Sequence, residues 1–423
     1  MPLYWEKLNG WTAITDTFIT LYANQPGAFW LDREHHPTNR HSIIGIGIPT
    51  DELPEYQDQQ ADLPFNFRPG VIGAFHYSQR PGDISTRSLL KVDRALVYDH
   101  DTKVIYFVAH VSTRQEFDEW HRAALLRIAL TGGGMAAHEL TFPAATAAEL
   151  VADDSTSEYL EKIGHAQQSI HSGDAYQLCL TTRLRGEYTG DPLSFFLRLR
   201  KQHPAPYSCF IRVENKTIVS ISPELFVSVH GRRVLSSPIK GTRKRSADAK
   251  QDIELMNQLG EDPKERAENL MIVDLIRNDL SVVCDASSVT VDSLLAVRSY
   301  STVHQLVSDV SGTLREDKTS LDALKSLFPG GSMTGAPKAS AMRILAELES
   351  SEREVYSGAL GYLCSNGDME LAMVIRTAVF DSQEVSIGIG GGITADSQPN
   401  SEHEEIKLKA LALAEVLGAR VRW

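Results

Sequence analysis

The order of helix-like and strand-like segments constrains the fold of this chain more than any other feature. Before residue 112, four apolar runs bounded by Gly, Pro, Asp or Asn are typical of strands, at residues 42–50, 68–78, 94–100 and 103–112. After residue 150, strand pairs at residues 217–235 and 371–393 mix irregularly with helical patterns at residues 265–280 and 401–418. Because no strand–helix–strand unit repeats, we predict an α+β fold.

The length of the chain indicates more than one structural unit. Its 423 residues exceed what a single hydrophobic core usually organises. A helical pattern at residues 116–130 ends at a glycine run, residues 132–134, and a segment rich in Ala, Ser, Thr and Asp follows at residues 141–163. We therefore place a boundary near residue 150, between a mainly β N-terminal region, residues 1–150, and a second unit, residues 151–423.

Charge and cysteine usage argue against several classes of partner. The formal net charge of −13 leaves no surplus of cations for nucleic acid or an anionic membrane, so an acidic ligand must be met by local cations. Cys179, Cys209, Cys284 and Cys364 are far apart and never in a CxxC spacing, which favours reduced thiols in a cytoplasmic protein. The first residues lack a signal-peptide pattern, and no apolar run is long enough to span a membrane.

Two groups of carboxylates are spaced so that each lies on one face of a helix. Glu265 and Glu268 are three residues apart on the earlier predicted helix, and Glu402, Glu405 and Lys409 stand at i, i+3 and i+7 on the later one. Carboxylate oxygens from two helices are ligands that suit Mg²⁺. The alternative is a solvated helix with a Glu405–Lys409 ion pair.

Glycines, a serine and an arginine provide candidate contacts for an anion. Gly390, Gly391 and Gly392 follow an apolar strand, and their amides either approach a carboxylate closely or form a tight turn. Arg376 ends an apolar strand, where its guanidinium needs an anion, either a ligand carboxylate or a protein carboxylate. Ser332 lies in a loop that runs into a helix and offers a hydroxyl to whatever binds above it.

A lysine lies in the basic stretch SPIKGTRKR, residues 237–245. Lys240 is a solvated loop lysine, a charge clamp for an acidic ligand, or a nucleophile, and this stretch alone leaves the three roles open. Only the context of the rest of the chain distinguishes them.

Ordered motifs across the second unit carry a resemblance to a known family. In sequence order they include SPELF, PIKGTR, AENLMIVDLIRNDL, FPGGSMTGAPK, GGGITADS and EHEEIKLKA. Through them, roughly residues 155–420 resemble the chorismate-utilising enzymes, which include anthranilate, isochorismate, salicylate and aminodeoxychorismate synthases. The resemblance implies an α+β fold of two antiparallel β-sheets packed face to face with outer helices. It also implies that residues 151–423 form a catalytic domain that binds the dicarboxylate chorismate with Mg²⁺.

The resemblance implies a role for each residue at a matching position. The implied metal ligands are Glu268 and Glu405, with Glu402 and Glu265 as direct or water-mediated neighbours. The implied substrate contacts are Gly390, Gly391, Gly392, Lys409, Arg376, Tyr362, Ser332 and Gln177. Among these, the glycines and Lys409 hold the ring carboxylate together with the metal, and Arg376 and Tyr362 hold the enolpyruvyl carboxylate. Glu224 is the implied general acid, which burial can keep protonated near neutral pH, and His304 lies near the ring.

Two positions select a branch of this family. Members that add water carry a lysine base where this chain has Gln177, and a glutamine cannot act as that base. Lys240 stands where anthranilate and salicylate synthases usually have alanine, and a lysine there resembles aminodeoxychorismate synthase component I. The resemblance therefore implies amination of chorismate at C4, toward 4-aminobenzoate and folate. The alternatives are anthranilate synthase component I and a noncatalytic chorismate-binding subunit.

Amination at C4 requires two successive allylic displacements, which makes Lys240 a candidate nucleophile. Its amine attacks C2 as the C4 hydroxyl leaves, and ammonia then adds at C4 as the lysine leaves. We expect burial to keep the amine neutral, helped by the neighbouring cations Arg243 and Lys244 if these face inward.

The nitrogen source is expected to be separate from this chain. None of its four cysteines lies in a GxCLGxQ-like turn, so ammonia comes from a separate glutamine amidotransferase subunit or is used free. Cys179 and His203 replace the residues that are usual in tryptophan-binding relatives, so the resemblance does not extend to tryptophan binding.

Overall fold

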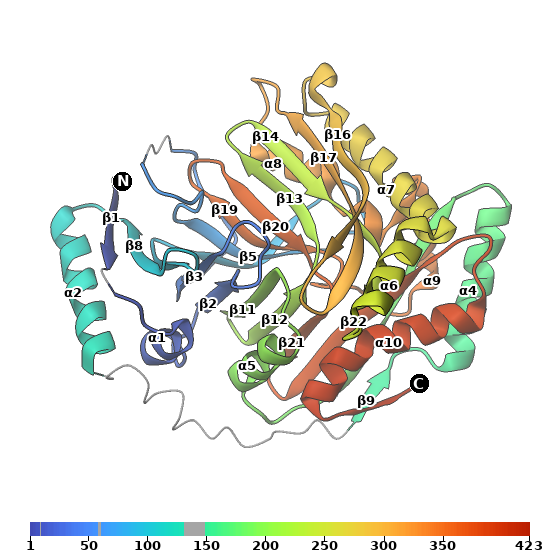
Figure 1. Cartoon of the computed structure of the whole chain (residues 1–423), viewed down its shortest axis with the longest axis horizontal. Helices are drawn as coiled ribbons and strands as arrows, with labels where there is room; N and C mark the ends of the chain where they lie inside the picture. Colours follow the sequence, from blue (N-terminus) through green and yellow to red (C-terminus); the bar gives the residue numbers. More distant parts are fainter. Residues whose placement is uncertain (9, 58–60, 131–148) are drawn as a thin grey trace.

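The strands form two large sheets in the computed structural model, which describes residues 1–8, 10–57, 61–130 and 149–423 (Figure 1). The first sheet runs in the order β1 (Leu3–Leu8), β8 (Val104–His110), β7 (Arg94–Asp99), β3 (His41–Ile46), β2 (Ala28–Asp32), β11 (Tyr207–Val213), β12 (Lys216–Ser222), β21 (Thr377–Asp381), β22 (Glu384–Ile393), β10 (Gln177–Glu187), β9 (Glu149–Ala152) and β23 (Arg420–Arg422). The short β18 (Gly335–Ala336) pairs with the start of β10.

The second sheet runs in the order β15 (Ile239–Lys244), β17 (Val303–Thr313), β14 (Arg233–Ser237), β13 (Leu225–His230), β20 (Met369–Met373), β19 (Ala359–Cys364), β5 (Gly70–His76), β6 (Ser85–Lys91) and β4 (Ile48–Thr50). The long strand β16 (Thr290–Ser299) pairs with β17. Within the described ranges every strand pairing is antiparallel except that of β9 with β23.

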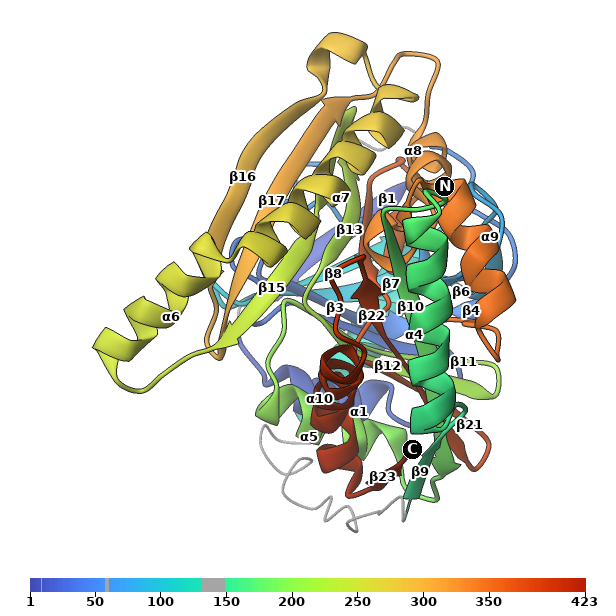
Figure 2. The ribbon, with the colours of Figure 1, turned by 90° about the vertical axis from the view of Figure 1, so that its right-hand side faces the viewer.

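Helices cover the outer faces of both sheets, as the two perpendicular views show (Figures 1 and 2). They are α1 (Ile14–Leu21), α2 (Arg114–Leu130), α4 (Thr156–His171), α5 (Pro192–Gln202), α6 (Ala249–Glu261), α7 (Pro263–Ser281), α8 (Ser320–Leu327), α9 (Lys338–Leu348) and α10 (Pro399–Leu417), with short 3₁₀ turns η1 (Ala286–Ser288) and η2 (Gly331–Met333). Figure 2 shows α6 and α7 lying along the strands β15, β16 and β17.

Three hydrophobic clusters fill the spaces between these layers. Along β2, Phe29 and Leu31 face the cluster between the two sheets, whereas the alternate residues Ala28 and Trp30 face the helices on the outer side. A further cluster packs the second sheet against α7 and α8, for example through Ile272. The layers are therefore helices, sheet, sheet and helices, which confirms the predicted α+β fold with two face-to-face sheets.

Local signals set the helix starts that carry the candidate site. The side chain of Asp262 caps α7, whose first residue is Pro263, and α10 likewise begins at a proline, Pro399. Glu265 and Glu402 consequently fall in the first turns of their helices. Carboxylates are favoured there because the helix macrodipole is positive at the N-terminus.

Most segments predicted from periodicity are present, but two predicted strand pairs are divided between the sheets. The four early apolar runs contain β3, β4, β5, β7 and β8, and the predicted helices are α2, α7 and α10, whereas β6 was not predicted. Strands β12 and β13 lie in different sheets, as do β20 and β21, whereas β13 pairs with β14 and β21 pairs with β22. The alternation of apolar residues is the same in either sheet, so it does not reveal where the chain crosses between them.

The N-terminal strands share both sheets with strands of the second predicted unit. β2 pairs with β11 in the first sheet, and β5 pairs with β19 in the second. The functional division near residue 150 stays a prediction, and the helix end predicted at residues 132–134 lies outside the described residues. No helix in the described part of the chain is long and apolar enough to cross a membrane.

Candidate active site

The two crossings between the sheets place Glu224 and Arg376 at the centre of the site. Glu224 lies between β12 and β13, and Arg376 lies between β20 and β21 with a left-handed φ of 50°. The crossings run side by side, because the amide of Met373 donates to the carbonyl of Glu224 at 3.0 Å and the amide of Ile221 donates to the carbonyl of Arg376 at 3.1 Å. Residues distant in sequence are thereby fixed next to each other.

Glu224 has the environment of a proton donor. Burial raises the pKa of its carboxyl to about 7, against the opposing effects of the Ser332 hydroxyl, Lys240 and Arg376. The Ser332 Oγ donates a hydrogen bond to Glu224 Oε1 at 2.9 Å. A carboxyl with this pKa holds its proton for part of the time at neutral pH, which is the property predicted for a general acid.

Arg376 offers an unpaired cation to the same site. Burial lowers the pKa of its guanidinium, and Glu224 is the charged neighbour that raises it, although a guanidinium keeps its charge in proteins. Within the described residues no carboxylate forms an ion pair with Arg376, so the protein-carboxylate alternative is wrong. The guanidinium is free to bind a ligand anion.

Lys240 lies in strand β15 and is not a solvated loop residue. Its Nζ is 3.4 Å from Glu268 Oε2, and its side chain is only 14% exposed. Burial lowers the pKa of this amine. The carboxylates of Glu268 and Glu224 and the Cys179 thiol raise the pKa by more than burial lowers it, so the net shift is upward.

The expectation that burial and two neighbouring cations keep the Lys240 amine neutral is therefore wrong for the ligand-free protein. Arg243 turns to Asp262, at 2.9 Å, and to Glu265, at 3.8 Å, while Lys244 is exposed. The effect of the facing carboxylates on the pKa outweighs that of burial, so the amine is held as an ammonium.

The predicted metal-binding carboxylates come from the first two turns of α7 and α10. Glu268 and Glu402 are buried, with 7% and 2% of their surface exposed. Lys264 Nζ joins the two helices, at 2.9 Å from Glu402 Oε1 and 3.9 Å from Glu268 Oε1. Ser397 Oγ also donates to Glu402 Oε1 at 2.8 Å.

The remaining two carboxylates lie at the rim of this group. Burial raises the pKa of Glu265, and the like charges of Glu268 and Glu405 raise it as well. The three carboxylates are therefore close enough to repel one another. Glu405 is 47% exposed and pairs with Lys409 at 2.8 Å, so the alternative of a surface pair holds for this residue while Glu402 is buried.

The residue types fit a magnesium ion better than their present arrangement does. Hard carboxylate oxygens from two helices, with open space for waters and a substrate oxygen, are what Mg²⁺ prefers. Within the described ranges no three His, Cys, Asp or Glu side chains stand close enough to hold a metal together, and the Lys264 ammonium bridges Glu268 and Glu402 instead. A cation already occupies the position between the two helices, and a metal could replace it there.

The three consecutive glycines belong to a strand, so the tight-turn alternative is wrong. Gly390, Gly391 and Gly392 of β22 pair with Thr181, Leu180 and Cys179 of β10. The pairing of β22 with β21 ends at Ile387, which leaves the other edge of the glycine segment without that partner. The carbonyl of Gly390 accepts a hydrogen bond from Lys409 Nζ at 3.0 Å.

The space around each glycine separates packing from ligand binding. A Cβ at Gly390 would lie 2.7 Å from the Leu180 carbonyl oxygen, so this position needs glycine for packing. A Cβ at Gly392 would lie 2.4 Å from Gln177 Nε2 and would require the end of the Gln177 side chain to move. A Cβ at Gly391 would meet nothing closer than 3.4 Å, and it would lie 3.8 Å from Glu402 Oε2. The packing of the protein would therefore tolerate a side chain at Gly391, and the contact of this glycine with a ligand stays a prediction.

Gly391→Ala is expected to fold normally but to bind chorismate at least about tenfold more weakly in the presence of Mg²⁺. The added methyl group is compatible with the strand but occupies the space beside Glu402. Calorimetric titration with chorismate checks the affinity, and thermal unfolding checks the fold. Gly164→Ala in α4, where a Cβ meets no atom within 4 Å, is the matched control and should bind as the parent does. Unchanged affinity of Gly391→Ala would remove the glycine segment from the site.

Gln177 offers an acceptor that the protein itself leaves unused. It begins β10 and is 1% exposed, and its Oε1 has no hydrogen-bond partner among the described residues. Buried acceptors without a partner are rare in folded proteins. A ligand hydroxyl or an N–H group would satisfy this oxygen, which supports the predicted substrate contact.

Two predicted site residues point elsewhere. His304 is buried, and its ring nitrogens lie 2.7 Å from Ser299 Oγ and 3.0 Å from Asp252 Oδ1, so its place near the ring stays a prediction. Tyr362 belongs to the cluster between the sheets and packs edge-on against Phe67. The contact of Tyr362 with a substrate carboxylate therefore stays a prediction.

The sequence interpretation missed residues that organise the site from outside. Lys264 precedes Glu268 by four residues, a spacing that signals an ion pair on a helix but not the longer reach to α10. Arg353 is buried and donates to the carbonyls of Met333 and Cys179, at 2.6 and 2.8 Å, so it ties the segment with Ser332 to β10. No local pattern marks that contact.

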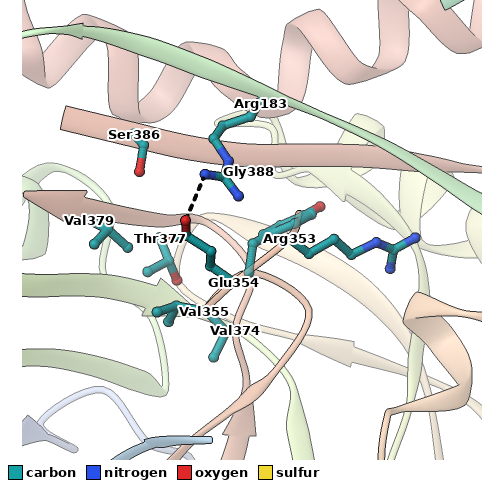
Figure 3. A pocket seen from close by; sticks show the side chains of 10 residues that line it. Arg183, Arg353, Glu354, Val355, Val374, Thr377, Val379, Ser386 and Gly388 are labelled. Atoms are coloured by element: carbon teal, nitrogen blue, oxygen red, sulfur yellow. Dashed lines mark ion pairs between the residues drawn. The ribbon is translucent and has the colours of Figure 1, made fainter. Parts of the chain in front are cut away.

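Two cavities lie apart from this group of side chains. The smaller, about 10 Å³, has room for one water molecule, and Figure 3 shows Arg183 and Glu354 on either side of it with their ion pair at 3.5 Å. The larger, about 330 Å³, is lined by residues within 76–87 and 346–354. Neither is lined by a predicted catalytic or metal-binding residue, so the chemistry of the side chains, and not cavity size, locates the candidate site.

Comparison with known proteins identifies the family to which the chain belongs. A family model for chorismate binding enzymes matches residues 3–415. The chain belongs to the chorismate-binding enzyme family. Among solved structures, the chain is similar to anthranilate synthase component I from Streptococcus pneumoniae TIGR4. The TM-score is 0.76 at 27% sequence identity, and the match covers 98% of this chain and 93% of that one.

Curated members of the family differ in the reaction that they are named for. The chain is 38% identical to aminodeoxychorismate synthase of Streptomyces griseus over 86% of its own length and 52% of that protein. It is 32% identical to anthranilate synthase component 1 of Lactococcus lactis over 86% of its own length and 82% of that protein. The chain thus spans about half the length of the Streptomyces relative.

Proposed function

We propose that this chorismate-binding enzyme places nitrogen at C4 of chorismate, giving 4-amino-4-deoxychorismate toward 4-aminobenzoate and folate. The observation that carries the proposal is the position of Lys240, whose amine lies 3.4 Å from Glu268 in a largely buried site that also holds Glu224 and Arg376. An amine on a strand inside the site can reach a bound ring, whereas a solvated one could not. The similarity to a protein named aminodeoxychorismate synthase supports the same branch.

In the proposed first displacement, the Lys240 amine forms a bond to C2 of chorismate. Both conjugated ring double bonds shift, the bond between C4 and its hydroxyl oxygen breaks, and Glu224 gives its proton to the departing oxygen, which leaves as water. Lys240 must first lose its extra proton, which passes to the Glu224 carboxylate and is the proton that Glu224 then gives to the departing oxygen.

In the second displacement, ammonia forms a bond to C4 while the bond between C2 and the lysine nitrogen breaks. Both ring double bonds return to their first positions. The lysine leaves as an amine that takes up a proton from the added nitrogen. The sum is chorismate plus ammonia giving 4-amino-4-deoxychorismate plus water. The Oε1 of Gln177, which lacks a protein partner, can accept a hydrogen bond from a reactant N–H or O–H group.

The proposed resident metal is Mg²⁺. The resemblance implied Glu268 and Glu405 as its ligands, with Glu402 and Glu265 beside them. Because Glu402 is buried whereas Glu405 is half-exposed and paired with Lys409, we place Glu402 with Glu268 as ligands and Glu405 with Glu265 beside them. Once bound, the ion would fix the ring carboxylate of chorismate and neutralise Glu268. Arg376 is then available for the second carboxylate of the substrate.

The second candidate is anthranilate synthase component 1, because one relative carries that name. That enzyme class needs nitrogen at C2 and loss of pyruvate, and a single displacement suffices. A buried lysine at the position of Lys240 has no role in that shorter reaction, which favours C4 amination.

The nitrogen source tests the proposal and the proposed partner together. With chorismate and Mg²⁺, the isolated chain is expected to consume ammonium and to be inactive with glutamine, because its four cysteines are all buried and none lies in an amidotransferase motif. Adding a glutamine amidotransferase subunit should make glutamine a substrate, and EDTA should abolish turnover until Mg²⁺ is restored. Glutamine-driven turnover by the isolated chain would contradict the partner, and full activity in EDTA would contradict the metal.

A further inference from the structure

The predicted metal-binding carboxylates are neutralised by basic side chains of the protein itself. Arg243 lies 3.8 Å from Glu265, and Lys409 lies 2.8 Å from Glu405. Glu268 and Glu402 share the Lys264 ammonium, at 3.9 and 2.9 Å, and the other oxygen of Glu268 lies 3.4 Å from Lys240. Lys264 differs from the other three cations because its ion pairs join α7 to α10.

The ammonium of Lys264 and a metal ion would compete for the same oxygens. Both Lys264 contacts are made to the Oε1 atoms of Glu268 and Glu402, and Glu402 Oε1 also accepts from Ser397. Two oxygens on one Mg²⁺ lie no more than about 4.2 Å apart, since each bond is 2.0–2.1 Å long. A divalent ion between these carboxylates therefore leaves no room for an ammonium that bridges them.

Lys264 is placed for this contact and not for the stability of its helix. It is the second residue of α7, where the macrodipole disfavours a cation. Its side chain is 49% exposed, compared with 14% for Lys240, so its flexible stem can carry the ammonium into solvent at small cost. The residue can bridge the carboxylates in the absence of metal and leave when a metal arrives.

We propose that Lys264 is a built-in counterion that occupies the metal position of the ligand-free protein and lowers its affinity for divalent cations. The inference rests on the proposed function, because it takes Glu268 and Glu402 as metal ligands. The lysine keeps two buried carboxylates together without metal, and metal binding must displace it. Tight metal binding then depends on a further negative charge, which the ring carboxylate of the substrate supplies.

Titration of the ligand-free protein with Mn²⁺ alone, followed by the electron paramagnetic resonance of free Mn²⁺, tests this inference. Lys264→Gln is expected to bind Mn²⁺ at least about tenfold more tightly than the parent and to have a lower Tm without metal. Lys264→Arg should keep the affinity of the parent, because a bridging cation remains. Arg277→Gln, which removes an exposed α7 cation paired with Asp274, is the matched control and should change neither quantity.

Each outcome of that titration decides something. Affinity of Lys264→Gln within twofold of the parent, or weaker, overturns the counterion role, since a merely structural lysine would loosen the site when lost. If Lys264→Gln does not fold, Lys264→Ala is titrated instead, with the same expected direction. If the parent and all variants fail to bind Mn²⁺ even with chorismate present, the proposed metal ligands are wrong and the counterion role falls with them.

Discussion

Lys240→Ala will lose at least about a thousandfold of the rate at which 4-amino-4-deoxychorismate forms. Loss of a covalent nucleophile raises the barrier by about 4 kcal/mol or more, whereas loss of a solvated lysine changes little. The cavity left by the side chain admits ammonia at C2, so residual turnover should shift toward the 2-amino isomer. Steady-state rates with product separation by chromatography and mass spectrometry check both effects.

Two further variants separate nucleophilic attack from charge. Lys240→Arg keeps a cation near Glu268 but has no neutral amine to attack C2, so it should be as inactive as Lys240→Ala. Lys244→Ala removes an exposed lysine of the same strand and should keep the parent rate. If Lys240→Arg retains most of the activity, Lys240 is a positioning charge and ammonia reaches C4 directly.

Glu224→Gln is expected to reduce turnover by about 10²- to 10⁴-fold, which is the usual contribution of a general acid. Glutamine preserves the size of the side chain and an acceptor for Ser332, but it has no acidic proton for the departing hydroxyl. With the concentration of free ammonia held constant, the contribution of Glu224 to turnover should fall as the pH rises through about 7, because the protonated carboxyl is the active form and its pKa is about 7. Rates measured from pH 5 to pH 9 check this limb.

We expect Ser332→Ala to move the Glu224 limb of the pH profile to higher pH. The Ser332 hydroxyl stabilises the charged form of Glu224 and lowers its pKa, so its removal should shift the limb to higher pH. Glu352→Gln removes an exposed carboxylate and should leave the limb in place. A pH profile that is the same for Ser332→Ala as for the parent would show that another group donates the proton.

The sequence predicted the elements of this fold better than their partners. Periodicity marks α7 and α10 because both helices bury one side against a sheet, and it marks the strands on either side of Glu224 and Arg376. It does not reveal that the chain changes sheet at those two residues, since strands of both sheets alternate in the same way. The crossings that create the site were therefore visible only in three dimensions.

The same limit explains why local patterns did not reveal the surroundings of some site residues. A motif identified Tyr362 by type, but alternation along β19 turns it to the side of Leu360 and Cys364, between the sheets. Lys264 bridges Glu268 and Glu402, and Glu402 lies 138 positions after Lys264 in the sequence. No local spacing encodes a contact over that separation. Burial of Glu224 could be expected from its apolar flanks, and its raised pKa confirms that expectation.

The position of nitrogen on the product tests the central claim most directly. The parent chain is incubated with chorismate, Mg²⁺ and ¹⁵N-labelled ammonium, and the product is examined by NMR and mass spectrometry. Amination through Lys240 predicts 4-amino-4-deoxychorismate, with the label bonded to C4 and the enolpyruvyl group retained. Label at C2, as 2-amino-2-deoxyisochorismate or as anthranilate with release of pyruvate, would contradict it.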